Sequence, residues 1–301
     1  MRGVVLASEA IAAGQLTRND LRRRYLKLHR DVYAPRDLEL TALDRAVAAW
    51  LWSRRAAVVA GCSAAAVLGS KWLPADEPAE LARVRYPSPA GIVVHSGIIA
   101  DDEVRRVDGM ACTTAARTAY DLGRRLTFER AVIRIDALLN ATGVPVATVG
   151  AVASRYPGAR GIRHLRRALD LVDAGAESPQ ETRLRILLVQ SGMPRPVTQI
   201  PVADQRGRVR RRIDMGWPEW MVGVEYDGEQ HFTSPDDYAD DIERLEFLAH
   251  RGWTIVRVSG RQLRWERPAV VQRVDRALAA AGMPRRHYGS CRKSAEIRQQ
   301  P

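Results

Sequence analysis

The chain has 301 residues, of which 46% are hydrophobic and 27% are charged, and its formal net charge is +12. Nothing in this composition is typical of collagen, a disordered chain or a disulfide scaffold, so it predicts a globular protein with a buried core. A length above the roughly 100 to 200 residues of one domain predicts two compact units. The three cysteines lie far apart, which fits reduced thiols and argues against a zinc site built on thiolates.

The longest apolar run, residues 56–69, is too short to cross a bilayer, and the N-terminus lacks the pattern of a signal peptide. We therefore expect a cytoplasmic protein with no membrane partner. The excess positive charge is arginine, whose forked guanidinium suits phosphate oxygens, so nucleic acid is the expected partner. A general use of arginine on the solvated surface is the alternative explanation.

Residues 1–40 are predicted to bind DNA through a winged helix-turn-helix. A helix over residues 8–13 ends at Gly14, and Thr17 opens a second helix through a Thr-x-x-Asp pattern with Asp20. We expect Leu21, Tyr25 and Leu28 to form the apolar stripe of that helix, followed by a short wing at residues 28–33.

The polar side of the second helix carries the residue types that a recognition helix uses in the major groove. The predicted DNA-binding residues are Arg18, Asn19, Arg22 and Arg23. A surface helix that is merely rich in arginine is the alternative interpretation.

Residues 41–172 are predicted to form a mixed α/β region with a helical connector. Strands are expected at 57–60, 82–86, 92–98 and 104–110, and helices at 43–52, 63–68, 114–124, 128–139, 145–156 and 161–172. Ser63 is expected to cap the second of these helices. The loop at residues 173–176 is the expected domain boundary.

Residues 177–281 are predicted to form a domain with the order α-β-β-β-α-β. Ser178, Pro179 and Glu181 have the spacing of a helix start, and Gly192 ends that helix. Strands are expected at 197–202, 208–215, 221–226 and 253–258, and further helices at 237–250 and 268–281. A basic, disordered tail is expected over residues 282–301, and it is either inert or in contact with nucleic acid.

Acidic residues gather on the third of these strands. Because side chains alternate along a strand, Glu225 and Asp227 point to one face, and Asp214 on the adjacent antiparallel strand can approach them. Like charges packed together are costly unless a cation neutralises them, and hard oxygen ligands favour Mg²⁺ or Mn²⁺. The predicted metal ligands are therefore Asp214, Glu225 and Asp227.

A metal held by carboxylates suits phosphodiester hydrolysis, which also needs a base for the attacking water. His231 follows Asp227 by four residues and has an ordinary pKa near 6.5, so it is the predicted base. Glu181 is a further candidate catalytic carboxylate. Taken singly, Asp227 can belong to a turn, Glu181 to a capping box and His231 to the surface.

The first half of the chain resembles AbiEi-type antitoxin-like proteins, whose N-terminal region is a winged helix. The resemblance rests on AIAAGQLTRNDLRRRYLKLHRDVYA from Ala10, AGCSAAAVLG from Ala60 and TTAARTAYDL from Thr113. Where that family usually has a histidine beside Ser63, this chain has Cys62. The resemblance implies DNA binding rather than chemistry.

From about residue 177 to 281 the chain resembles the Vsr-like endonuclease domains of the PD-(D/E)xK, restriction-endonuclease-like superfamily. The segments RIDMGWPEWMVGVEYDGEQH and DDIERLEFLAHRGWTIVRVSGRQLR carry this resemblance. It implies metal ligation by Asp214 and Glu225, a basic role for His231, and support from Asp241 and Arg244. Asp227 stands where the superfamily motif has a lysine.

The expected fold class is α+β or α/β, with a winged helix-turn-helix, a mixed region and a restriction-endonuclease-like αβββαβ core. The expected function is a metal-dependent DNA endonuclease whose basic N-terminal region positions the DNA. The alternative is a non-catalytic DNA-binding regulator or antitoxin with an inactive nuclease fold. A homodimer is left open.

Overall fold

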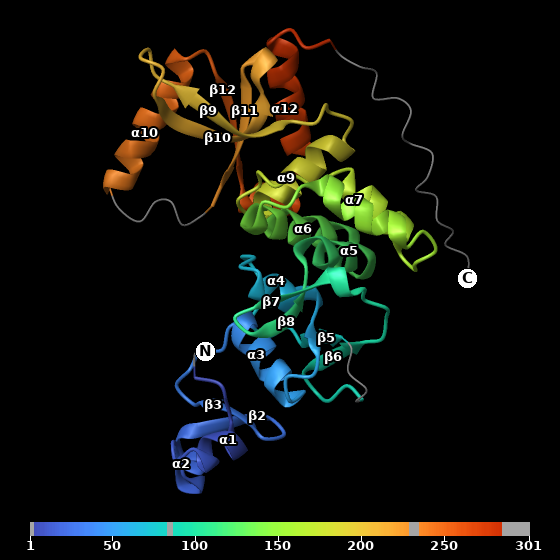
Figure 1. Ribbon diagram of the computed structural model, residues 1–301. Coiled ribbons are helices and arrows are strands. Elements are labelled where there is room, and N and C mark those ends of the chain that lie inside the picture. Colours follow the sequence, from blue (N-terminus) through green and yellow to red (C-terminus); the bar gives the residue numbers. More distant parts are fainter. Residues whose placement is uncertain (1–2, 83–86, 229–234, 285–301) are drawn as a thin grey trace, which may run out of the picture. The chain divides into compact units, whose positions relative to one another are not determined.

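The structure is a computed structural model that describes residues 3–82, 87–228 and 235–284. The chain divides into two compact units, unit 1 (1–174) and unit 2 (175–301), and the division falls within the loop at residues 173–176. Each unit mixes helices and strands (Figure 1). Regions 1–40 and 41–172 belong to the same unit, and Val32 of the first shares a hydrophobic cluster with Ala46 and Trp50 of the second.

Unit 1 begins with a three-stranded antiparallel sheet and two short helices. The strand order is β1-β3-β2, and the elements are β1 (Val5–Leu6), α1 (Ala7–Ala12), α2 (Arg18–Arg24), β2 (Tyr25–His29) and β3 (Val32–Pro35). The Thr17 hydroxyl accepts a hydrogen bond from the Asp20 amide at 3.1 Å, and the Asp20 carboxylate accepts one from the Thr17 amide at 2.9 Å. This capping box is the one that the sequence predicts.

The predicted length of the second helix is wrong. The backbone becomes extended at Tyr25, with φ −118° and ψ 152°, so Tyr25 and Leu28 lie in strand β2 and not on the apolar stripe of α2. Leu21 is the buried residue of α2. Pairing of Tyr25 with Pro35 across β2 and β3 outweighs the helical spacing, because the hairpin satisfies the backbone groups of this segment.

The rest of unit 1 contains a five-stranded mixed sheet of order β6-β5-β4-β8-β7. Its strands are β4 (Val58–Val59), β5 (Ala79–Ala82), β6 (Ile92–His95), β7 (Val104–Val107) and β8 (Met110–Thr113). Its helices are α3 (Ala42–Trp52), α4 (Gly61–Val67), the 3₁₀ helix η1 (Asp101–Glu103), α5 (Ala115–Arg125), α6 (Phe128–Thr142), α7 (Val146–Arg155) and α8 (Ile162–Leu169).

Ser63 does not cap a helix, contrary to the prediction. Helix α4 begins two residues earlier, at Gly61, and the Ser63 hydroxyl accepts a hydrogen bond from the Glu80 amide at 2.9 Å. Gly61 has φ +54°, and an added Cβ would lie 2.1 Å from a carboxylate oxygen of Glu80. The helix therefore starts where glycine fits against the half-buried carboxylate of Glu80.

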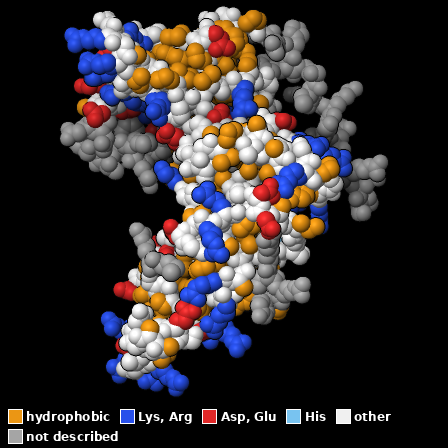
Figure 2. All heavy atoms as spheres, in the orientation of Figure 1, with side chains coloured by type: hydrophobic (Ala, Val, Ile, Leu, Met, Phe, Trp, Pro, Cys, Tyr) orange, Lys and Arg blue, Asp and Glu red, His pale blue; other side chains and the backbone are white. Residues whose placement is uncertain are grey.

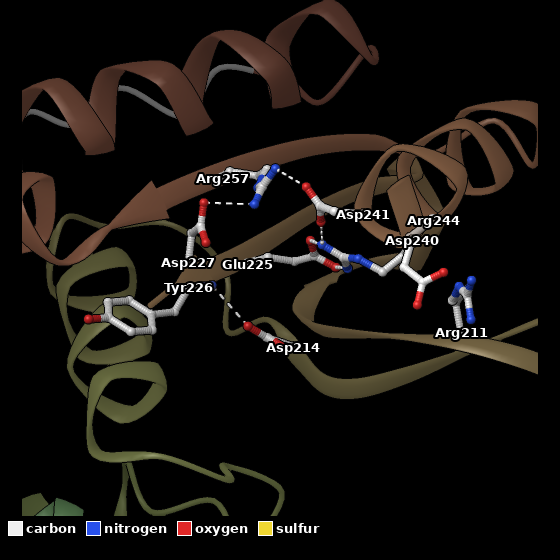
Figure 3. Close-up of a pocket in the computed structure, with 9 residues that line it drawn as sticks. All are labelled: Arg211, Asp214, Glu225, Tyr226, Asp227, Asp240, Asp241, Arg244 and Arg257. Carbon is white, nitrogen blue, oxygen red and sulfur yellow. Dashed lines mark hydrogen bonds and ion pairs between the residues drawn. The ribbon is translucent and has the colours of Figure 1, made fainter. Parts of the chain in front are cut away.

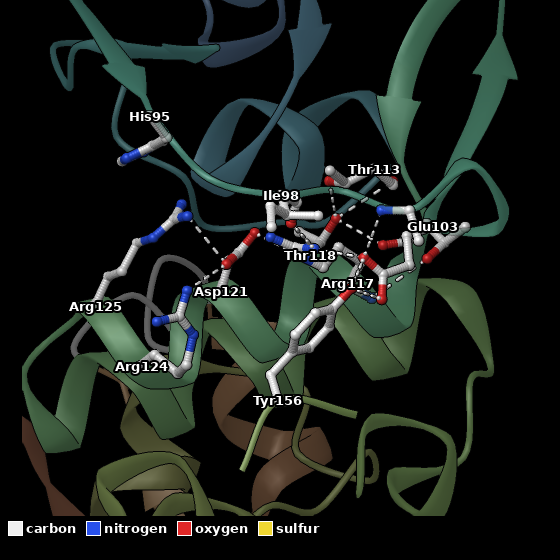
Figure 4. A network of polar contacts seen from close by, with 12 residues as sticks. His95, Ile98, Glu103, Thr113, Arg117, Thr118, Asp121, Arg124, Arg125 and Tyr156 are labelled. Carbon is white, nitrogen blue, oxygen red and sulfur yellow. Dashed lines mark hydrogen bonds and ion pairs between the residues drawn. The ribbon is translucent and has the colours of Figure 1, made fainter. Parts of the chain in front are cut away.

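Helix α5 carries the antitoxin-like segment from Thr113 to Leu122 and forms the centre of a buried polar network (Figure 4). The Arg117 guanidinium pairs with both Glu103 and Asp121, and all three side chains are at most 4% exposed. The Tyr156 hydroxyl donates to Glu103 at 2.9 Å. Each buried charge in the network has an opposite partner, and the network links η1, α5 and the end of α7. The polar residues of this segment therefore have a structural role.

Unit 2 contains a four-stranded sheet of order β12-β11-β10-β9, in which β11 and β12 are parallel and the other pairs antiparallel. Its elements are α9 (Pro179–Gln190), β9 (Val197–Ala203), β10 (Val209–Trp217), the 3₁₀ helix η2 (Pro218–Trp220), β11 (Val222–Asp227), α10 (Pro235–His250), β12 (Thr254–Ser259), α11 (Gly260–Trp265) and α12 (Arg267–Ala280). The predicted α-β-β-β-α-β order is found, and the short helix α11 was not predicted.

Helices cover both faces of this sheet. On one face, Leu184 of α9 and Val274 of α12 pack against Val224 of β11. On the other face, Leu248 of α10 packs against Ile213 of β10. Gly223 lies on the α10 side, where an added Cβ would lie 2.8 Å from a methyl group of Ile213.

No single helix of the described residues is long and apolar enough to cross a membrane. By length and composition alone, α6 and α7 pass such a test only together, as a pair bent by 118°.

Candidate active site

Unit 2 contains a cavity of about 390 Å³ at the end of the sheet beside α10 (Figure 3). It is lined by Arg211, Asp214, Glu225, Tyr226, Asp227, Asp240, Asp241, Arg244 and Arg257. Asp214, Glu225, Asp227, Asp241 and Arg244, all expected at a site from the sequence, thus line one cavity. The cavity thus brings together carboxylates and guanidinium groups from three strands, β10, β11 and β12, and from helix α10.

The geometry of strands β10 and β11 accounts for this gathering. Glu225 and Asp227 alternate with Tyr226, and both carboxylates face α10 while Tyr226 packs on the opposite hydrophobic cluster. The β10–β11 pairing ends at Met215 and Val224. Beyond that point the Tyr226 amide donates to the Asp214 carboxylate at 2.9 Å, in place of a backbone carbonyl.

Two arginines link the other acidic residues into a chain of ion pairs. Arg244 of α10 binds both oxygens of Glu225, at 2.6 and 2.8 Å, and approaches Asp241 at 3.3 Å. Arg257 of β12 pairs with Asp241 at 2.6 Å and with Asp227 at 2.7 Å. The chain Glu225–Arg244–Asp241–Arg257–Asp227 fixes the relative positions of its side chains because each guanidinium is a planar, multiple donor.

Asp214 is the exception among these carboxylates. No cationic side chain of the described chain forms an ion pair with it, and its one hydrogen bond comes from the Tyr226 amide. Burial, together with the negative charges of Glu181 and Glu225, raises the pKa of Asp214 from 3.8 to about 7, although the Tyr226 amide and the nearby charge of Arg244 act against the shift. This carboxylate is therefore held in a place that disfavours its charge unless a cation binds.

Glu181 lies on α9, close enough for its charge to act on Asp214. The Ser178 hydroxyl accepts a bond from the Glu181 amide at 3.1 Å, as the capping pattern predicts. The Glu181 carboxylate accepts from the Glu177 amide at 3.0 Å and from the Gln199 side chain at 3.1 Å. Burial raises the pKa of Glu181 as well, so two neighbouring carboxyl groups share an environment that resists a second negative charge.

The described residues do not gather three or more His, Cys, Asp or Glu side chains into a group that could hold a metal ion. Asp227 and Glu225, expected as ligands beside Asp214, are each engaged by an arginine. The donors still fit a hard cation, since Asp214, Glu225 and Glu181 offer only oxygen and Asp214 has no cationic partner. The predicted base His231 lies outside the described residues.

The predicted DNA-binding residues of unit 1 lie together on α2. Arg18, Asn19, Arg22 and Arg23 are all exposed, while Leu21 is buried on the opposite side of the helix. The Arg22 guanidinium donates to the Asn19 side chain at 3.4 Å.

Sequence reasoning missed four residues of the cavity, Arg211, Tyr226, Asp240 and Arg257. Arg257 pairs in register with Glu225 across the parallel strands β11 and β12, and it alternates with the core residues Val256 and Val258. That alternation was a readable signal that Arg257 faces α10. Arg211, three residues before Asp214, lies in an arginine run whose register shifts at a bulge, so alternation alone did not place it.

The chain is similar to two uncharacterised proteins of Mycobacterium tuberculosis, MT2308 of strain CDC 1551 and Rv2248 of strain H37Rv. Each is 30% identical to it over 200 residues, which make up 66% of this chain and 73% of the relative. The chain belongs to the family of these mycobacterial proteins. No family model and no solved structure matches it.

Proposed function

We propose that unit 2 is a metal-dependent endonuclease domain of the restriction-endonuclease-like class and that the chain acts on DNA. The observation that carries this proposal is Asp214, a half-buried carboxylate that forms no ion pair within the described residues, beside Glu181 and Glu225 at the point where β10 leaves β11. The α-β-β-β-α-β order that positions it supports the proposal, as does the resemblance to Vsr-like domains.

The cavity has the two kinds of charge that phosphodiester hydrolysis needs. Asp214 and Glu225 of the cavity, with Glu181 of α9, which does not line the cavity but whose charge acts on Asp214, would hold Mg²⁺ or Mn²⁺, which when bound stabilises charge on the phosphoryl oxygens and lowers the pKa of water. The guanidinium groups of Arg244 and Arg257 line the same cavity and offer donors to phosphate oxygens.

Side chains of the protein would position the carboxylates and accept the proton of the attacking water. Arg244 fixes Glu225 through two hydrogen bonds, and Arg257 fixes Asp227, so both carboxylates keep one orientation before substrate arrives. His231 would accept the proton of the attacking water, in place of the superfamily lysine whose position Asp227 occupies.

A supercoiled plasmid incubated with the full chain and Mg²⁺ or Mn²⁺ tests this proposal. Wild type should convert it to the open-circular form, and Asp214→Asn and His231→Ala should each lower the rate by about a hundredfold or more, since general-base effects alone reach that size. Glu219→Gln, an exposed carboxylate outside the cavity, is the matched control and should cut like wild type. Equal nicking by wild type and Asp214→Asn contradicts the proposal.

A second function, a DNA-binding regulator or antitoxin without nuclease activity, is favoured by a different observation. Arginines engage both Glu225 and Asp227, and Asp227 replaces the superfamily lysine. In unit 1, two helices followed by the β2–β3 hairpin have the element order of a winged helix, with exposed arginines on α2.

The regulator predicts binding to a DNA duplex that is sensitive to salt and unchanged by Asp214→Asn. It also predicts that Arg22→Ala with Arg23→Ala weakens binding, whereas the matched pair Arg105→Ala with Arg106→Ala, exposed on β7, leaves it unchanged. Equal binding by both double variants would exclude a role for α2.

A further inference from the structure

The β9–β10 hairpin carries a concentration of positive charge that the sequence-based assignment of DNA contacts did not use. Five of its seven residues from 206 to 212 are arginines. Arg206, Arg208, Arg210 and Arg212 are exposed, and Arg211 lines the acidic cavity. Figure 2 shows Lys and Arg side chains gathered at the end of unit 2 where this hairpin turns.

The tip of the hairpin is a well-defined turn. The Asp204 carboxylate accepts hydrogen bonds from the amides of Arg206 and Arg208, at 2.9 and 3.0 Å, and the Asp204 amide donates to the Arg208 carbonyl at 2.8 Å. Gly207 has φ +77°, a conformation that glycine adopts without strain. The arginines are therefore presented by a fixed backbone, which lowers the entropy lost on binding a rigid ligand.

The charges of the hairpin are available to an external anion. Within the described part of the chain, Arg206 and Arg210 have no ion-pair partner. Arg208 reaches Asp204 only at 3.4 Å with 64% of its side chain exposed, and Arg212 pairs with Glu177 where both side chains are more than half exposed. Such exposed pairs are weak and screened by salt, so a polyanion can displace them.

We propose that the β9–β10 hairpin binds the sugar-phosphate backbone of a DNA duplex and leads it to the carboxylate cavity. This inference rests on the proposed nuclease function, because the choice of DNA as the partner depends on the carboxylate cavity being a site that cleaves it. The major groove of DNA admits a two-stranded β-ribbon. Within β10, Val209 to Asp214 spans five residue steps, or about 17 Å at about 3.3 Å per residue, which matches about five base pairs, and Arg206 and Arg208 lie beyond it in the turn.

Arg211 connects the exposed arginines of the β9–β10 hairpin with the carboxylate cavity. It precedes Asp214 by three residues on β10 and lines the same cavity (Figure 3). A backbone phosphate held by Arg211 therefore lies at the entrance to the carboxylates, whereas phosphates farther along the strand meet the hairpin arginines. The ribbon thus acts as a positioning surface for the duplex.

Binding of a fluorescent duplex to the full chain without divalent cation tests this inference separately from cleavage. For Arg206→Gln with Arg210→Gln, we expect the slope of log K against log salt to become shallower by about 1.8, which is 0.9 for each lost phosphate contact. Affinity at 0.1 M salt should fall by about tenfold or more. Arg261→Gln with Arg264→Gln, two exposed arginines on α11, removes the same charge and should leave the slope unchanged.

The outcomes separate the two proposals. A hairpin variant with the affinity and slope of the α11 variant overturns the inference, even if wild type nicks plasmid. A single strand bound as tightly as the duplex also overturns it. Wild type that neither binds nor nicks DNA contradicts the proposed function itself.

Discussion

Replacing Asp214 by asparagine should stabilise unit 2 at neutral and alkaline pH when no divalent cation is present. The folded protein raises the pKa of Asp214 from 3.8 to about 7, so its ionised form is less favourable in the folded state than in the unfolded state. Since one pKa unit corresponds to about 1.4 kcal/mol, the ionised carboxylate lowers the free energy of unfolding by about 4 kcal/mol. Asparagine keeps an oxygen that accepts the Tyr226 amide and carries no charge.

The sign of the pH dependence follows from the raised pKa. Below about pH 3 the carboxyl group is protonated in both states, so wild type and Asp214→Asn should be equally stable. As pH rises towards 7, the unfolded state loses its proton first, and wild type should fall behind the variant by about 1.4 kcal/mol per pH unit. Above about pH 7 both states are ionised and the difference should be constant.

Urea unfolding monitored by hydrogen exchange in the peptides of β10 and β11 measures unit 2 apart from unit 1. Glu219→Gln, outside the cavity, is the control. It keeps Asp214, so the difference in stability between it and wild type should not follow the titration of Asp214. A difference between wild type and Asp214→Asn that does not change from pH 4 to pH 8 would refute the argument from burial and like charge.

Repeating the urea unfolding measurement with a divalent cation tests whether Asp214 binds that cation. At pH 8, Mg²⁺ or Mn²⁺ at about a hundred times its dissociation constant should stabilise wild type by about 2.7 kcal/mol and Asp214→Asn much less. Equal stabilisation of both proteins would exclude Asp214 as a ligand and leave the pH argument intact.

Three further substitutions and one chemical modification test the packing and charges of the fold. Gly223→Ala should lower the free energy of unfolding of unit 2 by about 1 to 3 kcal/mol, as measured in urea, because the added Cβ has no room against the neighbouring isoleucine methyls. Gly150→Ala, in open space on α7, should instead raise the free energy of unfolding of unit 1 by about 0.5 to 1 kcal/mol. Arg244→Leu should destabilise unit 2 by about 3 kcal/mol by leaving the buried Glu225 unpaired, and an unchanged urea midpoint would contradict that pair. Burial raises the pKa of Cys112 to about 12, so its peptide should stay unalkylated by iodoacetamide at pH 8 until the chain is unfolded, as read by mass spectrometry.

Much of the local structure was predictable from the sequence because its signals are local. The Thr17–Asp20 capping box, the start of α9 at Ser178 and the order of elements in unit 2 each depend on residues within one turn or strand. Where a local signal competed with pairing across the fold, pairing decided. Tyr25 fits a helical stripe by spacing, yet it pairs with Pro35 in a hairpin.

The sequence by itself determined which residues could form a site: strand alternation put Glu225 and Asp227 on one face, and the spacing of strands brought Asp214 near them. The tertiary structure alone decided their charge partners. Arg257 reaches Asp227 from a strand thirty residues later in the chain, which leaves Asp214 without a cationic partner among the described residues. The reason is physical, since the pKa and pairing of a carboxylate depend on burial and on charges within a few ångströms, and these neighbours are brought together only by folding.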